Sequence, residues 1–519
     1  MTPDGFSRRY FFFGSLLAGA VPAAGFGSSA SLKALGYRSP NEKLNIASVG
    51  AGGKAASDIT ACSATENIVA LCDVDDKRAA AIFERFPNVP RYKDYRQMLE
   101  KENRNIDAVI VAIPDHMHAA AALTAMELGK HVYVQKPLAR TVHECRLLRE
   151  AARKYKVATQ MGNQGYSNEG TRQCAEMIWS GVIGDVTEVH AWTNRPIWPQ
   201  GLPDLPQEGR VPDTLNWDLW LGIASMRPYS EKYAPFAWRG FFDFGCGSLG
   251  DMACHILGAP NVALRLGSPT SVECLGQEGK SKYYYPSKST IRFEFPARGA
   301  MPALKLTWYD AMKVQPEIAG IPAGERLGDL PRRRVAGEAQ QPPNPNTNPW
   351  VQGQIFTAAQ LEAPAPAAPA QAQPQPRQRR GQQGDANARL DAQVTRAAGQ
   401  GSNGSLFVGD KGLITTATYG EMTRLVPMEK MKDYKMPPQF LTRSPGHYRD
   451  WLRACKGGEP SCSNFDVAAP FTEWVLLGVI ALHFEGKLLW DGEAGRFTNN
   501  DDANRFLRPA VRDGWRLPG

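Results

Sequence analysis

The chain has 519 residues, of which 43% are hydrophobic and 22% are charged, as in a soluble globular protein with more than one domain. Its formal net charge of +8 at pH 7 suggests a nucleic-acid partner, but much of the excess arginine lies near the N-terminus and in a low-complexity stretch. Such runs are usually solvated, so we expect no nucleic-acid binding. The nine cysteines contain no Cys-x-x-Cys pair and predict neither a disulfide framework nor a metal site.

Residues 1–36 have the pattern of an export signal and leader. Arg8 and Arg9 precede an uncharged stretch, 13–32, that is rich in Leu, Ala and Gly. This arrangement resembles a twin-arginine (Tat) signal and predicts a periplasmic or secreted protein. An uncleaved anchor is the alternative, because the stretch is long enough to span a bilayer. Its glycines, alanines and Pro22 favour export without a stable membrane anchor.

A glycine-rich turn follows the first predicted strand, 44–49, and leads into a predicted helix, 54–64. Strand, glycine-rich turn and helix together form the usual cradle for a dinucleotide pyrophosphate. The first glycine permits the tight turn, the second lets the backbone approach the phosphates, and a small third residue lets the helix pack closely. The residues that we assign to this cradle are Gly50, Gly52, Gly53 and Ala55.

A second predicted strand, 68–73, ends in Asp73, 23 positions after Gly50. An acidic residue at this place accepts hydrogen bonds from the adenosine ribose and repels a 2′-phosphate. The cofactor predicted from the sequence is therefore NAD rather than NADP.

From 43 to 164 the sequence alternates between strands and helices. Strands are predicted at 106–113, 131–134 and 157–161, and helices at 119–128 and 142–155. This rhythm predicts a doubly wound, Rossmann-type parallel sheet with helices on both faces. Ligands bind beyond the carboxyl ends of such strands. The polar residues and prolines expected at these ends are Pro114, Asp115, His118, Gln135, Lys136 and Asn163. All of these except Asp115 are predicted to contact the cofactor.

After 164 the pattern changes to strands with few helices between them. It predicts an α+β substrate domain over 165–490, with a largely antiparallel sheet and helices at 171–180, 447–454 and 471–484. A low-complexity insertion rich in Ala, Pro and Gln interrupts this domain at 311–404. The insertion has too few large apolar residues to form a core. A C-terminal tail is expected at 491–519. The predicted strands are 186–192, 271–274, 290–295, 303–308, 405–408 and 413–418.

Two segments carry residues suited to proton transfer. Lys136, after a strand of the cofactor domain, can bind a substrate hydroxyl; an ordinary solvated lysine is the alternative. Asp251 and His255 are four residues apart, so on a helix they share a face, and the carboxylate can orient the imidazole. A helix-capping Asp with a packed His is the alternative. Trp238 and Arg239 are secondary candidates for binding a sugar.

Together these pieces resemble the Gfo/Idh/MocA oxidoreductases, named for glucose-fructose oxidoreductase and inositol dehydrogenase. The resemblance covers about 43–309 and 405–490, and its motifs include Ile113-Pro-x-x-x-His118, Gln135-Lys136-Pro137 and Asp251-x-x-x-His255. It implies hydride transfer between a sugar or polyol carbon and NAD, with Lys136, Asp251 and His255 as catalytic residues, in a homo-oligomer. The family usually has Glu where this chain has Gln135, which makes the acid–base role of the lysine less secure.

Three functions remain open from the sequence. The first is an exported NAD-dependent sugar oxidoreductase whose cofactor stays bound through turnover. The second is an NAD-dependent glycoside hydrolase that oxidises its sugar transiently. The third is a non-catalytic sugar-binding protein that has kept the fold.

Overall fold

The computed structural model describes residues 42–329 and 402–518. The predicted leader 1–36 and most of the predicted insertion therefore lie outside the described residues. Within the described ranges, none of the helices has the length and apolar character needed to cross a membrane.

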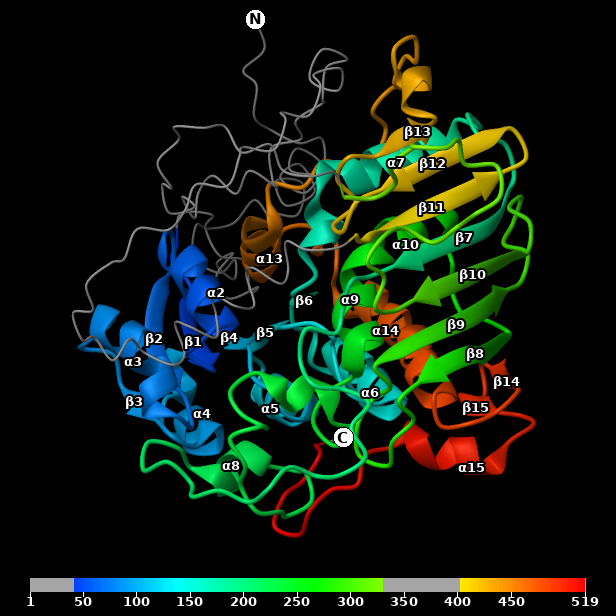
Figure 1. Cartoon of the computed structure of the whole chain (residues 1–519). Coiled ribbons are helices and arrows are strands. Elements are labelled where there is room, and N and C mark those ends of the chain that lie inside the picture. The colour runs from blue at the N-terminus through cyan, green and yellow to red at the C-terminus, as the bar shows by residue number, and fades with distance from the viewer. Residues whose placement is uncertain (1–41, 330–401, 519) are drawn as a thin grey trace, which may run out of the picture.

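A parallel sheet forms the first part of the chain, with the strand order β3-β2-β1-β4-β5-β6 (Figure 1). This is the doubly wound order expected for dinucleotide binding, and it confirms the predicted α/β fold. The central strand β4 is completely buried because helices cover both faces of the sheet. The strands are β1 (Asn45–Val49), β2 (Asn67–Cys72), β3 (Arg91–Tyr92), β4 (Ala108–Val111), β5 (His131–Val134) and β6 (Thr159–Met161).

The helices of this part begin at side chains that cap their free N–H groups. Thr141 and Glu144 form a reciprocal capping box at the start of α6. Asp75 and Asp94 accept hydrogen bonds at the starts of α3 and α4, two helices that we did not predict. The helices are α2 (Lys54–Ser63), α3 (Asp76–Arg85), α4 (Tyr95–Lys101), α5 (His118–Glu127) and α6 (Val142–Tyr155).

A second sheet has the order β13-β12-β11-β7-β10-β9-β8-β14-β15. Among its described strands, β7 and β10 pair in parallel and the other neighbours pair antiparallel, as predicted for the second domain. Its strands are β7 (Val186–Trp192), β8 (Ser271–Glu278), β9 (Lys288–Phe295), β10 (Leu304–Tyr309), β11 (Gly404–Gly409), β12 (Gly412–Thr416), β13 (Arg424–Val426), β14 (Lys487–Asp491) and β15 (Arg496–Phe497).

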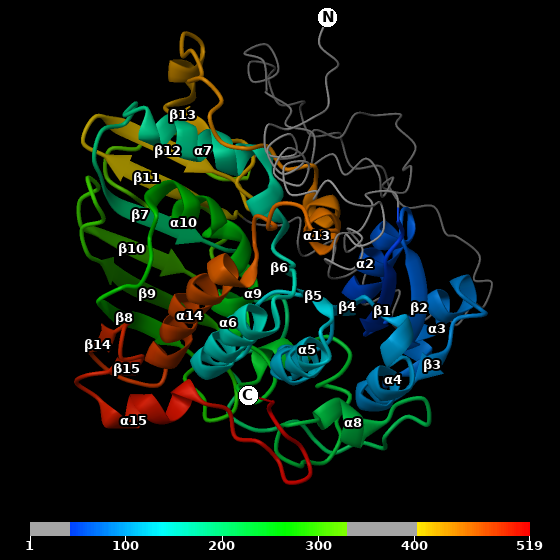
Figure 2. The ribbon, with the colours of Figure 1, turned by 180° about the vertical axis from the view of Figure 1, so that it is seen from behind.

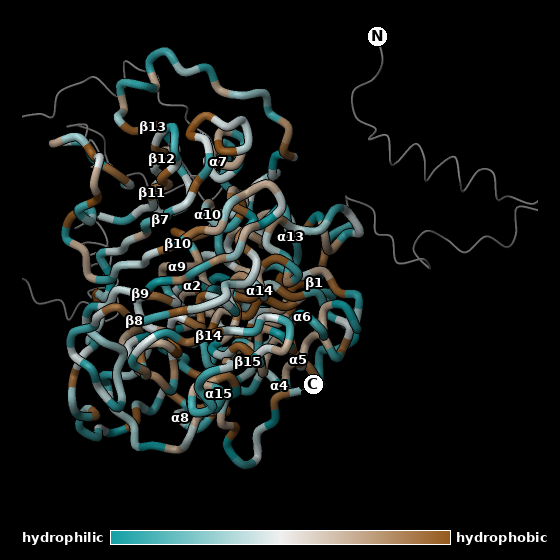
Figure 3. Tube along the Cα trace, turned by 90° about the vertical axis from the view of Figure 1, so that its right-hand side faces the viewer, coloured by the Kyte–Doolittle hydropathy of each residue, from teal (hydrophilic) through white to brown (hydrophobic). Residues whose placement is uncertain are grey.

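Helix α14 (Phe465–Ala481) joins the two halves, because it packs against α6 on one side and against α9 (Gly247–Ile256) and β8 on the other (Figure 2). Its sequence is apolar on all sides, as expected for a helix inside a protein. Figure 3 shows the brown, hydrophobic trace gathered around it and teal on the outer loops. The helix starts at Phe465 rather than at the predicted 471, because the side chain of Asn464 caps it upstream of Pro470.

The remaining helices lie around the second sheet or between the two sheets, except α8, which lies beside the parallel sheet (Figure 1). They are α7 (Glu169–Trp179), α8 (Trp217–Leu221), α9 (Gly247–Ile256), α10 (Gly258–Leu264), α13 (His447–Cys455) and α15 (Asp501–Asn504).

Part of the predicted insertion belongs to the folded domain. Leu327 is 1% exposed and packs with Trp192, Leu406 and Val426. The predicted start at 311 is therefore too early, because a few large apolar residues in 311–329 suffice to anchor this segment on the sheet. The predicted boundary at 490 also divides β14, whose last residue, Asp491, pairs with Arg496 of β15.

Candidate active site

The turn between β1 and α2 lies directly against the end of β4. Gly50 has φ +95°, and a Cβ at this position would collide with the carbonyl oxygen of Ala112. Both observations require glycine here. No side chain caps the start of α2, which leaves its first N–H groups available to an anion. Ala55 is fully buried against the sheet, so the small third residue allows the close packing predicted for it.

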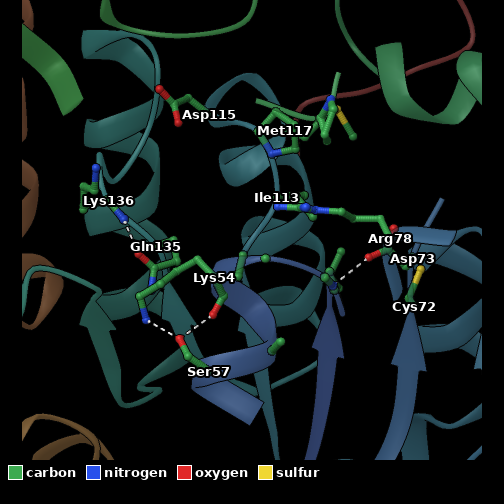
Figure 4. A pocket seen from close by; sticks show the side chains of 18 of the residues that line it. Lys54, Ser57, Cys72, Asp73, Arg78, Ile113, Asp115, Met117, Gln135 and Lys136 are labelled. Atoms are coloured by element: carbon green, nitrogen blue, oxygen red, sulfur yellow. Dashed lines mark hydrogen bonds between the residues drawn. The ribbon is translucent and has the colours of Figure 1, made fainter. Parts of the chain in front are cut away.

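Asp73 holds this turn in place. Its carboxylate accepts hydrogen bonds from the N–H groups of Ala51 at 2.8 Å, Gly52 at 3.1 Å and Asp75 at 3.0 Å. Burial raises the pKa of Asp73, and the three donors act in the opposite direction. The side chain of Arg78 crosses the turn beside it (Figure 4). The ribose contact that we predict for Asp73 stays a prediction; the structure adds its role in tying the turn to β2.

A cavity of about 1290 Å³ extends from this turn to the predicted catalytic residues. Its lining includes Gly50, Gly52, Gly53, Asp73, Lys136 and His255. Figure 4 shows Asp73 and Lys136 on opposite sides of it. Pockets for single small ligands are usually about 300–1,000 Å³. The size, the open helix N-terminus and the glycine cradle together fit a dinucleotide with a second molecule beside it.

Lys136 and Asp251 form an ion pair in the wall of the cavity. The Lys136 ammonium donates to the Asp251 carboxylate at 2.6 Å and to its carbonyl oxygen at 2.9 Å. The guanidinium of Arg239 also donates to this carboxylate, at 3.4 Å. Burial alone would raise the pKa of Asp251, but the two cations outweigh burial and lower it well below its usual range. Asp251 is therefore ionised and holds Lys136 at the cavity.

The expected contact between Asp251 and His255 is not formed, because the carboxylate turns to Lys136, 115 positions earlier in the chain. His255 instead meets the ring of Tyr419 edge-on, with ring centroids 4.7 Å apart. Its Nδ1 is buried and has no hydrogen-bond partner among the described residues. Burial, assisted by Lys136, lowers the pKa of His255 well below its usual value. The imidazole is therefore neutral at pH 7 and able to accept a proton.

Asp115, which the sequence places at a strand end without a role, also lines the cavity. It is 5% exposed, and burial raises its pKa to about 7 even though Arg239 and Lys136 act against burial. It therefore titrates near neutral pH beside the ion pair.

We expect Asp115→Asn to stabilise the protein at pH 8 and to change its stability little at pH 4. The folded pKa of about 7 lies above the unfolded value, so the folded state keeps a proton that the unfolded chain loses. As pH rises from the unfolded pKa to the folded pKa, the free energy of unfolding falls by roughly 4 kcal/mol in total. Asparagine does not titrate, so the Asp115→Asn variant does not lose this stability. Melting temperatures of the variant and the wild type at both pH values test this expectation. The control is Asp213→Asn, because the Asp213 side chain is 87% exposed. Equal shifts at both pH values would contradict the assignment.

Two predicted cofactor contacts do not reach the cavity. Both ring nitrogens of His118 lie 2.8 Å from carbonyl oxygens, those of Pro137 and Ile113, and the ring is fully buried. Asn163 is equally buried and accepts a hydrogen bond from Ser463. Neither residue lines the cavity as described, whereas Pro114, also predicted, does. His118 and Asn163 therefore brace the wall from behind.

Gln135 lines the cavity, and its departure from the family pattern has a local cause. Its amide donates to the carboxylate of Asp58 at 2.7 Å, and its oxygen accepts from the Lys136 N–H at 3.3 Å. Asp58 is fully buried and also binds Lys54 and the hydroxyl of Tyr448. A glutamate at 135 would place a second buried carboxylate against Asp58, which a neutral amide avoids.

An aromatic wall lies beside the ion pair. The Arg239 guanidinium lies 4.2 Å from the ring centre of Trp238 and 4.7 Å from that of Phe236. All three residues line the cavity. The sugar contacts that we predict for Trp238 and Arg239 stay predictions. The cavity is also lined by residues that no sequence pattern singled out, because they come from segments far apart in the chain. These are Leu215, Phe236, Tyr419, Tyr448 and Trp515.

Residues 44–163 match the oxidoreductase family Gfo/Idh/MocA in its NAD-binding Rossmann fold, and residues 176–275 match the C-terminal α/β domain of that family. Two stretches of the chain are therefore similar to the two domains of the Gfo/Idh/MocA family. The family resemblance expected from the sequence motifs is confirmed.

Two curated proteins are similar in sequence to parts of this chain. The inositol 2-dehydrogenase of Salmonella typhimurium is 31% identical over 125 residues, which are 24% of this chain and 37% of the dehydrogenase. A glycosyl hydrolase family 109 protein of Solibacter usitatus is 31% identical over 202 residues, 36% of this chain and 45% of that protein. The chain thus spans less than half the length of these curated relatives.

Solved structures share the whole fold. The WlbA dehydrogenase from Bordetella pertussis, in complex with NADH and UDP-GlcNAcA, matches with a TM-score of 0.51 at 13% identity, covering 87% of this chain and 99% of that one. The aldose-aldose oxidoreductase from Caulobacter crescentus, complexed with glycerol, matches with a TM-score of 0.50 at 14% identity, covering 86% and 100%. At these identities the likeness establishes the fold.

Proposed function

We propose that the protein is an NAD-dependent oxidoreductase that acts on a hydroxyl of a sugar or polyol. The observation that carries this proposal is the cavity that joins the glycine-rich turn to Lys136 and His255, with Asp251 bound to Lys136. One end fits a dinucleotide, and the other offers a cation, a neutral imidazole and aromatic surface. Bound NAD would supply the hydride acceptor in this cavity.

Lys136 orients the reacting hydroxyl. An ammonium group has three N–H donors, and Asp251 takes two of them, so the third is left for a substrate oxygen. The positive charge also stabilises an oxygen that is losing its proton. Asp251, which also pairs with Arg239, keeps the ammonium group in this position.

His255 accepts the hydroxyl proton. Because its pKa is lowered, the ring is neutral at pH 7, and one imidazole nitrogen carries a free lone pair. His255 would hold the hydroxyl proton on its imidazole. Bound NAD would accept the hydride from the same carbon, which would become a carbonyl.

The experiment that tests the function combines cofactor titration with a substrate panel. We expect NAD to bind more tightly than NADP, because a 2′-phosphate would meet Asp73 at the end of β2. We also expect conversion of a sugar, polyol or glycoside, followed by mass analysis of the products. Tighter binding of NADP would contradict the assignment of Asp73, and absence of NAD binding would refute the function.

The alternative is an NAD-dependent glycoside hydrolase, which the 202-residue match to a family 109 glycosyl hydrolase supports. Such a reaction oxidises the sugar transiently and returns the cofactor to its initial state. The same cavity residues would serve it. Cleavage of a glycoside without net change in NAD would identify this activity.

We also keep the proposal that the chain is exported by a twin-arginine signal and works as a homo-oligomer. Arg8 and Arg9 support the export. Replacing both with lysine should leave the protein in the cytoplasmic fraction of cells that carry the export machinery, whereas wild type moves to the periplasm. An unchanged distribution would refute this route.

A further inference from the structure

Two segments from outside the parallel sheet cover the end of the cavity at Asp73 and Val74. One is 209–221, which includes α8, and the other is the C-terminal stretch 508–518, here called the tail. Figures 1 and 2 both show the red tail beside α8, next to the parallel sheet. Leu215, Leu219 and Trp515 from these segments line the cavity. The acid after β2 marks this end as the place of the adenosine.

The first segment is bound to the end of β2 through its backbone. The Asn216 N–H donates to the Val74 carbonyl at 2.9 Å, and the Asp76 N–H donates to the Thr214 carbonyl at 3.1 Å. The Lys93 ammonium donates to the same Thr214 oxygen at 3.2 Å. These bonds fix Leu215 over the cavity.

The tail is fastened to this first segment by Arg512. Its guanidinium donates to the Asp218 carboxylate at 2.6 Å and to the carbonyls of Asp218 at 3.1 Å and Gly222 at 3.0 Å. Its backbone N–H donates to the Ile223 carbonyl at 3.0 Å. The Arg512 side chain is 12% exposed, whereas the Asp218 side chain is 61% exposed. Arg512 does not itself line the cavity.

Trp515 is the part of the tail that faces the cavity. The Arg96 guanidinium lies 4.1 Å from the centre of its ring, and the Tyr95 ring lies 6.5 Å away. Tyr95 also lines the cavity, so two aromatic rings stand at this end. Flat bases stack well on such rings, and Arg planes add to the attraction.

We propose that Trp515 and the tail form an adenine-binding clamp that retains the dinucleotide between turnovers. The clamp rests on the proposed function, because it needs the dinucleotide to lie with its adenosine end at Asp73. Release of the adenosine requires the tail to move, and Arg512 holds the tail down. Arg512 is a positioning residue, whereas Trp515 contacts the base.

The test measures how fast the purified full chain releases NADH after mixing with excess NAD, followed by the nicotinamide fluorescence. We expect Trp515→Ala and Arg512→Ala each to speed release roughly ten- to hundredfold, as loss of one base stack predicts. The double variant should release little faster than Trp515→Ala alone, because both changes remove the same contact. The control is Arg516→Ala in the same tail, whose 73%-exposed side chain pairs with Glu127. It should leave the rate unchanged.

A second probe separates the clamp from a general loss of structure. Reduced nicotinamide mononucleotide lacks the adenosine, so its affinity should be the same in wild type, Trp515→Ala and Arg512→Ala. Unchanged NADH release in both variants, or equal weakening of both probes, would overturn the clamp while the proposed function stands. A wild-type protein that binds neither NADH nor NAD would overturn the function and the clamp with it.

Discussion

His255→Ala is expected to lower kcat by roughly 10²–10⁴-fold, the usual contribution of a general base. NAD binding should change little, because His255 comes from α9 and not from the glycine-rich turn. Steady-state rates and NAD titration of the same preparation provide the measurement. His190→Ala is the matched control, since His190 is a partly buried imidazole on β7 bonded to the Tyr309 hydroxyl and does not line the cavity.

The pH profile gives a second readout for the same residue. The lowered pKa of His255 keeps the base unprotonated below pH 6.5, so the rate should fall only at a pH well below that value. A fall centred near the ordinary histidine pKa would contradict the buried, neutral ring. A His255→Ala variant with the wild-type rate would assign His255 to packing against Tyr419.

Gly50→Ala is expected to abolish NAD binding and to lower the melting temperature. Alanine at φ +95° costs about 1–2 kcal/mol in backbone strain, and its Cβ would also collide with the Ala112 carbonyl. The turn must then move away from β4, which displaces the N–H groups at the start of α2. Thermal denaturation and NAD titration measure the two effects.

Gly181→Ala separates the strain from the collision. Gly181 has φ +77°, and nothing lies within 4 Å of a Cβ placed there. The Gly181→Ala variant should lose stability through the backbone strain alone and should bind NAD as tightly as the wild type. Equal loss of stability in both variants would show that the contact with β4 is unimportant.

Local sequence determined much of this protein. The apolar run of β4 predicts a strand buried on both faces, and the glycine-rich turn is required by backbone geometry at Gly50. Helix α6 and strand β7 both have the bounds predicted from the spacing of their apolar residues. Their apolar faces pack against the core, and this packing follows the helix and strand periods. Helices α3 and α4 were not predicted. Helix α3 has few large apolar residues and α4 spans only two turns, so neither shows a clear helical periodicity.

Only the tertiary structure decided which side chains meet in the cavity. The spacing of Asp251 and His255 suggested a pair, but Lys136 lies close enough in space to take the carboxylate. An ammonium ion binds a buried carboxylate more strongly than a neutral imidazole does, and burial keeps that imidazole neutral. Trp515 reaches the cavity from the end of the chain, because Arg512 fastens the tail to α8. Contacts over such separations depend on how the loops pack, and no local pattern of residue types records that packing.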